Sequence, residues 1–143
     1  MRAFILILLL TFSSIASDSS LDLQVKILEK VLNEISINKK KIIWSDNKSI
    51  CKAIEKNRLI QTTPECKYAT ILILQDKKNL PKECYECVLF VLDYELLSKM
   101  PNSFGAFFWK KGRPNIVILK SRLKSLFIKA SSDLDPYLEE KAW

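Results

Sequence analysis

Four cysteines are the residues of this chain whose chemistry depends most on spacing and compartment. Cys84 and Cys87 form a Cys-x-x-Cys pair, which serves thiol catalysis, zinc binding or a disulfide in different proteins. A thiol oxidoreductase places this pair after a strand, at a helix N-terminus whose dipole lowers the thiol pKa. Here the pair precedes an apolar run and lies beside Glu83 and Glu86, whose charges raise a thiol pKa. The sequence therefore argues against thiol catalysis.

Disulfides are the expected role of all four cysteines. A four-cysteine zinc site would need two close pairs, and Cys51 and Cys66 are far apart in the sequence. Of the three connectivities that four cysteines allow, we favour Cys51 with Cys66, which would tie a helix to the next strand, and Cys84 with Cys87. So tight a second bridge would be easily reduced, and a redox switch there is a hypothesis. We predict no metal and no cofactor.

Three aspartates follow predicted strands, where open α/β sheets gather their ligands. Carboxylates at Asp46, Asp76 and Asp93 suit acid–base chemistry or cation binding, but helix caps and turns use the same residues. The chain has no histidine, which excludes His-dependent triads and removes the commonest general base. We therefore expect no enzyme and no catalytic residue. The candidates for a ligand-binding edge are Ser45, Asp46, Asn47, Gln75, Asp76, Asp93 and Tyr94.

The segment FGAFFWKKGRP, residues 104–114, combines aromatic and basic side chains. Residues of these types are enriched at protein interfaces. Alternation along a strand turns about half of the aromatic side chains toward the core and leaves the others for a partner. The candidate partner-binding residues are Phe104, Phe108, Trp109, Lys110, Lys111 and Arg113.

The first residues have the three parts of a secretory signal peptide: Arg2, the apolar stretch 4–12, and small residues up to Ala16. This stretch is shorter than the roughly 20 apolar residues that span a bilayer. Cleavage after about Ala16 would leave residues 17–143 as one periplasmic α/β domain without stable membrane insertion. The formal net charge of +7 favours anionic partners, but the basic residues are dispersed along the chain. We therefore expect no nucleic-acid partner.

Apolar periodicity predicts the elements of the first third of the chain. Residues 21–36 repeat apolar side chains at helical spacing and predict an amphipathic helix that packs on a sheet. Residues 41–44 predict a short strand. The polar residues 45–47 offer capping oxygens for a second helix that carries Ile50 and Ile54.

Two bare apolar runs, residues 69–74 and 88–92, are typical of strands that are covered on both faces. Asp93 can cap a short helix over residues 94–99, which Pro101 would end. This order of strands and helices is typical of an α/β protein with a parallel sheet.

The last third of the chain predicts a hairpin and two helices. Strands 105–109 and 115–119 are joined by a loop in which Gly112 can take the positive φ that a hairpin needs. Residues 123–130 predict a helix, and Asp135-Pro136 resembles the start of a short terminal helix. The predicted fold is a single α/β domain with a mostly parallel central sheet of about five strands, a C-terminal antiparallel hairpin, and helices on both faces.

Two segments carry a family likeness: CKYATILIL, and CVLFVLDYELLSKMPNSFGAFFWKKGRPNIVILKSRLKSLFIKASSDL. In particular Cys66 opens a buried strand, Gly105 precedes the hairpin loop, and residues 115–119 lead into the segment 123–132. With these features the chain resembles the YfiR-like family of small bacterial periplasmic regulators. It departs from the family pattern at Phe104, where a second glycine is expected, and it lacks a Trp-Pro near the first helix.

The resemblance implies a periplasmic protein that binds the periplasmic domain of another protein. In the type case it restrains a membrane-bound cyclic-di-GMP synthase, with disulfides needed for that activity. We accordingly expect a non-catalytic regulator in the cell envelope that binds another periplasmic or membrane protein, with a homodimer as a further option. The alternatives are a structural or assembly factor of an envelope complex, such as a motility or secretion machine, and a small-ligand-binding periplasmic protein.

Overall fold

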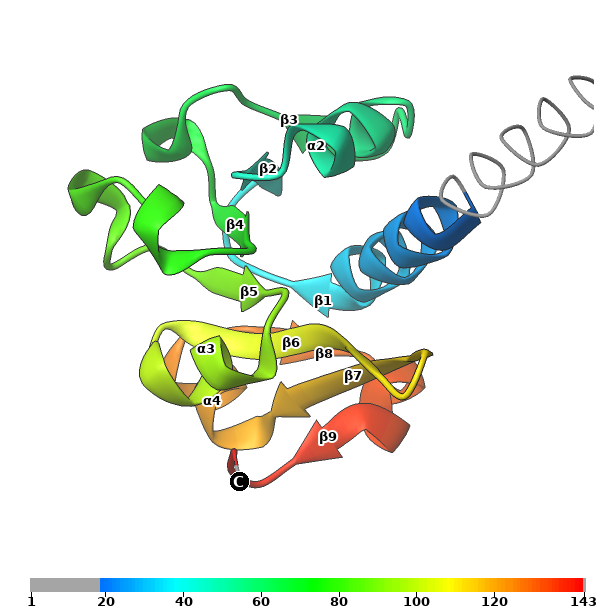
Figure 1. The fold of residues 1–143 in the computed structure, drawn as a ribbon. Helices are drawn as coiled ribbons and strands as arrows, with labels where there is room; N and C mark the ends of the chain where they lie inside the picture. Colours follow the sequence, from blue (N-terminus) through cyan, green and yellow to red (C-terminus); the bar gives the residue numbers. More distant parts are fainter. Residues whose placement is uncertain (1–18, 143) are drawn as a thin grey trace, which may run out of the picture.

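The fold is organised by a mostly parallel sheet of seven strands in the computed structural model, which describes residues 19–142 (Figure 1). In chain order the strands are β2 (Ile42–Ser45), β3 (Gln61–Thr62), β4 (Ile71–Leu74), β5 (Leu89–Val91), β6 (Ser103–Lys110), β7 (Arg113–Leu119) and β9 (Leu138–Glu139). Their order across the sheet is β3-β2-β4-β5-β6-β7-β9. Only the β6–β7 pair is antiparallel among these neighbours. The predicted signal peptide, residues 1–16, lies outside the described residues.

A helix over residues 19–34 leads into β1 (Ile35–Ser36), which pairs antiparallel with β8 (Lys129–Ala130) in a separate two-stranded sheet. The predicted end of this helix at residue 36 is wrong, because the backbone at Ile35 and Ser36 extends to pair with β8. Its apolar face packs on the sheet, as predicted from its periodicity.

One face of the sheet is covered by this first helix and by α2 (Lys48–Glu55). The Asn47 side chain begins α2 by accepting hydrogen bonds from the amides of Ser49 and Ile50, at 3.0 and 3.2 Å. The side chains in this first core come from both helices, from alternate positions of the strands and from the C-terminal segment. Among its fully or almost fully buried members are Leu28, Leu32, Ile43, Ile50, Ile54, Ile71, Ile73, Phe90, Phe104, Phe107 and Leu134.

The opposite face is covered by α3 (Tyr94–Lys99) and by short 3-10 turns, of which η1 (Cys66–Tyr68) and η3 (Lys82–Cys84) adjoin each other. A further turn, η2 (Lys77–Asn79), follows β4. Asp93 caps α3 by accepting from the Glu95 amide at 3.0 Å, as predicted. This second core contains Cys66, Leu72, Leu74, Leu80, Cys84, Leu89, Val91, Leu96, Leu97, Met100, Ala106 and Leu119. Helices therefore cover both faces, as predicted.

Gly105 marks an irregularity where β6 meets β5. The pairing shifts by one residue, so that Leu89 faces Ser103 and Phe90 faces Gly105. A Cβ at Gly105 would lie 2.8 Å from the Val117 carbonyl oxygen and 3.0 Å from the Phe90 ring. Glycine is required because the neighbouring strand and this ring approach the backbone so closely.

The loop of the β6–β7 hairpin consists of two residues, Lys111 and Gly112, with φ of 52° and 75° between the paired Lys110 and Arg113. Positive φ at both loop residues matches the type I′ turn, whose twist suits a two-residue hairpin. The positive φ predicted for Gly112 is confirmed.

The C-terminal segment differs from its prediction. α4 (Lys120–Ser125) is shorter than the predicted helix 123–130, because Phe127 takes a φ of 57° and the chain then extends into β8. The predicted start at Asp135-Pro136 is also wrong. A 3-10 turn, η4 (Ser132–Tyr137), begins earlier, with the Ser131 hydroxyl accepting from the Asp133 amide at 3.3 Å.

The predicted α/β class with a mostly parallel sheet and a hairpin is confirmed. The seven-stranded sheet has two strands beyond the five predicted, β3 and β9, which lie at its edges and are two residues long each. Within residues 19–142, no helix combines the length and the apolar composition needed to cross a bilayer.

Candidate functional site

Trp109 is the most exposed aromatic side chain of the predicted interface, at the outer end of β6. It is 44 % exposed and lies edge-on to the buried Phe107 ring, with 5.4 Å between the ring centroids. Pro114 stands opposite it across the hairpin. Trp109 is thus held by the core at one edge and retains nearly half of its surface for a partner.

Three exposed basic residues lie in or next to the hairpin loop: Lys110, Lys111 and Arg113. None of them takes part in the ion pairs formed between residues of the described chain. We call Trp109, Lys110, Lys111 and Arg113 the hairpin tip. An aromatic side chain beside unpaired positive charges is suited to an acidic protein surface that also offers apolar contact.

Phe104 and Phe108, the other predicted interface residues, do not belong to the tip. Phe104 is fully buried, with its ring centroid 5.4 Å from that of Phe90, because the shift in pairing turns it into the first core. Its prediction as a partner-binding residue is wrong. Phe108 is partly buried and its ring meets Tyr94 edge-on at 5.1 Å.

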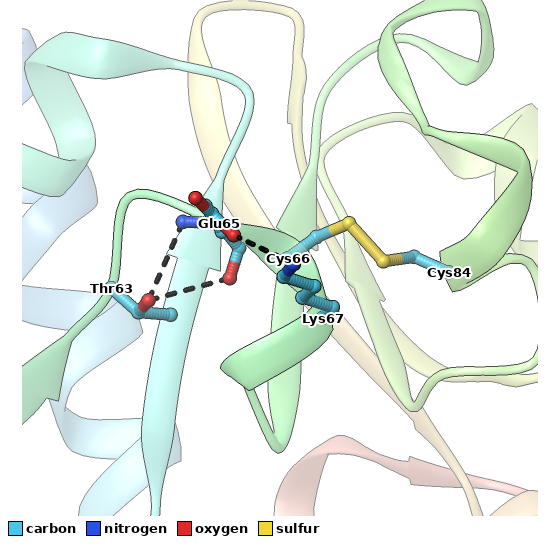
Figure 2. The surroundings of a disulfide bond; sticks show 5 residues. All are labelled: Thr63, Glu65, Cys66, Lys67 and Cys84. Carbon is cyan, nitrogen blue, oxygen red and sulfur yellow. Dashed lines mark hydrogen bonds and ion pairs between the residues drawn. A yellow bond between two sulfur atoms is a disulfide. The ribbon is translucent and has the colours of Figure 1, made fainter.

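The disulfide joins Cys66 to Cys84, both buried in the second core (Figure 2). Cys66 begins η1 just before β4, and Cys84 ends η3 before β5, so the bridge ties together the entries to two neighbouring parallel strands. Near Cys66, the Thr63 hydroxyl donates to the Glu65 carbonyl and accepts from its amide, at 3.3 and 3.4 Å. This turn leads the chain into η1.

Both predicted pairings, Cys51 with Cys66 and Cys84 with Cys87, are therefore wrong. Cys51 lies on α2, which packs on the first core, whereas the Cys66 side chain belongs to the second core. Cys84 points into the second core from η3, and the Cys87 amide donates to the Cys84 carbonyl at 3.1 Å in the turn that follows. Cys51 and Cys87 are both free and half-buried.

Burial raises the pKa of the Cys87 thiol. Burial is also the main cause that raises the pKa of Cys51; hydrogen bonding with the Ser45 backbone lowers this pKa, and the charge of Glu55 raises it further. Both thiols are accordingly held in the protonated, weakly nucleophilic form at neutral pH.

The predicted ligand edge is partly assembled at the ends of β2 and β4. Asp46 accepts hydrogen bonds from the amides of Gln75 and Asp76, at 2.8 and 3.0 Å, and from the Asn79 side chain at 2.9 Å. The Asn47 side chain donates to that of Gln75 at 2.7 Å. These contacts hold the ends of β2 and β4 together, so the Asp46 carboxylate has a structural role.

The remaining edge candidates serve local structure. Ser45 is buried and its hydroxyl accepts from the Asn47 amide at 3.1 Å. Asp76 caps η2 through the Lys78 amide at 3.1 Å, and Asp93 caps α3. Tyr94 packs on Phe108. The strand-end carboxylates thus act as helix caps and as ties between strand ends.

A hollow of about 670 Å³ lies beside this edge, between α2 and the segment around β3. Ser45 and Asp46 line it, whereas the other predicted edge residues do not. The lining residues that the prediction missed are Trp44, Lys48, Cys51, Lys52, Glu55, Thr62, Thr63, Pro64 and Asn79. The basic pair Lys48 and Lys52 stands one helical turn apart on α2, a spacing visible in the sequence once α2 was assigned.

Searches against protein-family models and against curated proteins found no match for this chain. The likeness to the YfiR-like family rests on the quoted sequence segments alone and stays a prediction. The partner class and the compartment that it implies are accordingly proposals.

Proposed function

We propose that this chain is an exported, non-catalytic binding domain that regulates another protein of the bacterial cell envelope by presenting the hairpin tip to an acidic surface of that protein. The observation that carries the proposal is Trp109, nearly half exposed among three cations that have no carboxylate partner within the described chain. Aromatic and arginine side chains are the usual centres of binding energy at protein interfaces.

The proposed compartment is the periplasm. Disulfides persist in oxidising compartments and are rare in the cytosol, so the Cys66–Cys84 bridge supports export. The sequence pattern of residues 1–16 and the resemblance to the YfiR-like family support the same location. Regulation without catalysis fits the strand-end carboxylates, which are engaged as caps and ties.

The test is affinity capture of partners from envelope extracts by the wild-type chain and by the double variant Trp109→Ala with Arg113→Ala. The matched control is Tyr68→Ala with Lys67→Ala, since Tyr68 is 61 % exposed and Lys67 lies 5.1 Å from its ring. We expect the hairpin variant to lose the captured protein and the control variant to retain it. Equal capture by all three proteins would refute the proposed interface.

The size of the captured complex distinguishes a regulator from a structural or assembly factor. A single membrane or periplasmic protein supports the regulator, whereas a large envelope complex supports the structural or assembly factor. Capture should also weaken as salt rises, because the exposed charges of the tip are screened within about 8–10 Å at physiological ionic strength.

The hollow of about 670 Å³ beside α2 favours small-ligand binding as a second candidate function. Lys48 and Lys52 on its wall suit the anionic group of a metabolite, and Asp46 and Glu55 line the same hollow. A thermal-shift screen of small carboxylates and phosphates tests this function, with Lys48→Ala and Lys52→Ala expected to abolish any stabilisation. The absence of any stabilising compound would retire the ligand-binding candidate.

A further inference from the structure

Phe127 is an exposed aromatic residue in a backbone conformation that phenylalanine seldom adopts. Its side chain is 82 % exposed and its φ is 57°. The amides of Phe127 and Ile128 donate to the carbonyls of Lys124 and Leu123, at 3.3 and 2.9 Å, which is the Schellman ending of a helix. Glycine is the favoured residue at the place that Phe127 occupies. Neither the backbone nor core packing therefore accounts for an aromatic ring here.

The Phe127 ring stands between two hollows, of about 480 and 660 Å³. Phe127, Ile37 and Asn38 line both of them. Val88 and Leu126 add apolar surface to the first, and Leu123 and Ile128 add it to the second. A projecting ring with a concave, partly apolar surface on each side is suited to an extended chain that crosses the ring and places a side chain in each hollow.

The charges around Phe127 are mainly positive, although the first hollow is lined by Glu86 as well as Lys39. Lys120, Lys124 and Lys129 line the second hollow, and no acidic residue does. Lys120 pairs with Glu140 at 3.5 Å, but Lys124 and Lys129 take part in none of the ion pairs between residues 19–142. Two uncompensated cations thus flank the ring, and they favour an occupant that carries carboxylates.

We infer that Ile37, Asn38, Lys124, Phe127 and Lys129, the Phe127 surface, bind an extended acidic segment of another protein, with apolar side chains of that segment in the two hollows. This surface is separate from the hairpin tip. The tip includes the first residue of β7, whereas α4 follows the last one, and Figure 1 shows the hairpin loop and α4 at opposite ends of the β6–β7 pair. Docking of one surface on the other in a second copy is disfavoured because both are basic.

Peptide selection tests the inference. Random peptides displayed on phage are selected on the mature wild-type chain and depleted on the Phe127→Gly variant. We expect the surviving peptides to combine Asp or Glu with Leu, Ile or Phe. A synthetic peptide from this pool should bind the wild type about tenfold or more tighter than Phe127→Gly, and likewise tighter than Lys124→Glu with Lys129→Glu.

Stability distinguishes a binding role from a structural one. Phe127→Gly should unfold at the same or a higher denaturant concentration than the wild type, because glycine tolerates the positive φ without strain. Leu59→Gly is the control, since Leu59 is 85 % exposed elsewhere on the chain, and it should keep full peptide binding. The Trp109→Ala, Arg113→Ala variant should also keep it, because the two surfaces are separate.

The inference is overturned if no peptide survives depletion, if the surviving peptides lack acidic residues, or if Phe127→Gly binds them as well as the wild type does. A membrane is the competing occupant of an aromatic and basic surface. Vesicles of phosphatidylglycerol that capture the wild type but not Phe127→Gly, without a matching acidic peptide, would assign the surface to lipid and overturn it as well.

Discussion

Arg122, on α4, places one guanidinium nitrogen within hydrogen-bonding distance of four acceptors. Its Nη1 atom lies 2.8 Å from the Leu97 carbonyl, 3.0 Å from that of Met100 and 2.8 Å from that of Ser103, with the Ser103 hydroxyl at 3.1 Å. These acceptors lie at the end of α3 and the start of β6, so one guanidinium joins both to α4. Burial lowers the pKa of Arg122.

Replacing Arg122 by alanine should lower the free energy of unfolding by about 2 kcal/mol, because partly buried carbonyls lose a charged donor. Lys124→Ala, on the exposed side of the same helix, should change it little. Urea unfolding followed by circular dichroism measures both variants. Equal stability of the two would show that the Arg122 contacts contribute nothing to the fold.

The two free thiols should make the alkylation rate and the stability of the protein depend on pH. Alkylation of Cys51 and Cys87 by iodoacetamide should be slow at neutral pH in the folded protein and fast in urea, because burial raises both thiol pKa values. The folded state keeps these protons to higher pH than the unfolded chain does. Their contribution to stability is therefore complete below the ordinary thiol pKa and is lost as the pH rises above it.

Mass spectrometry after timed alkylation, in Cys51→Ser and Cys87→Ser variants, reports each thiol separately. The rate at each site should increase steadily with pH. Rapid, pH-independent alkylation of Cys87 at neutral pH would indicate an activated thiolate and contradict the raised pKa.

Residues whose partners lie close in the sequence were predictable. The caps at Asn47 and Asp93 and the positive φ of Gly112 depend on the next few residues only. The cysteine pairing was not, because it depends on which face of the sheet each sulfur reaches. Phe127 fitted the apolar spacing of a longer helix, and only the early end of α4 leaves it in solvent.

At the scale of elements, the disulfide holds the entries to β4 and β5 together. Cys66 and Cys84 are 18 residues apart. Closing such a loop lowers the entropy of the unfolded chain, which stabilises the folded state by about 3 kcal/mol. In a Cys51→Ala, Cys87→Ala background, adding a reductant should lower the free energy of unfolding by roughly that amount. Unchanged urea unfolding with and without the reductant would contradict this role.

A side chain at Gly105, where β6 lies between β5 and β7, should destabilise the fold. Gly105→Ala places a methyl group 2.8 Å from the Val117 carbonyl oxygen, an atom of the neighbouring backbone that cannot easily give way. The expected loss is about 2 kcal/mol of stability, measured by thermal or urea unfolding. Ala106→Gly, one residue along β6, is the comparison, since it removes a methyl group and should create a small gap instead of a clash. An unaltered midpoint in Gly105→Ala would show that β6 can move away from β7.

Elements with a strong pattern of their own were predicted from the sequence. The runs that form β4 and β5 are fully buried and read as strands without any knowledge of their neighbours. The strands β1, β3, β8 and β9 are two residues long and are defined by the backbone they pair with. No local pattern of two residues distinguishes such a strand from a loop.

At the scale of the whole molecule, the parallel sheet separates two cores and carries a basic surface at each end of the β6–β7 pair. The layer arrangement was predictable because β4 alternates Ile71 and Ile73 toward one core with Leu72 and Leu74 toward the other. Which aromatic residues are exposed was not predictable from the sequence. The burial of Phe104 and the exposure of Phe127 each follow from an irregular backbone position.

The hairpin tip can be tested directly in cells by incorporating a photo-crosslinking amino acid at Trp109, and at Tyr68 as the exposed aromatic control. Irradiation should produce one discrete adduct of the chain with an envelope protein from position 109, weakened by Arg113→Glu, and no such adduct from position 68. The same adducts from both positions, or none from position 109 in cells where affinity capture recovers the partner, would contradict the hairpin tip as the contact surface.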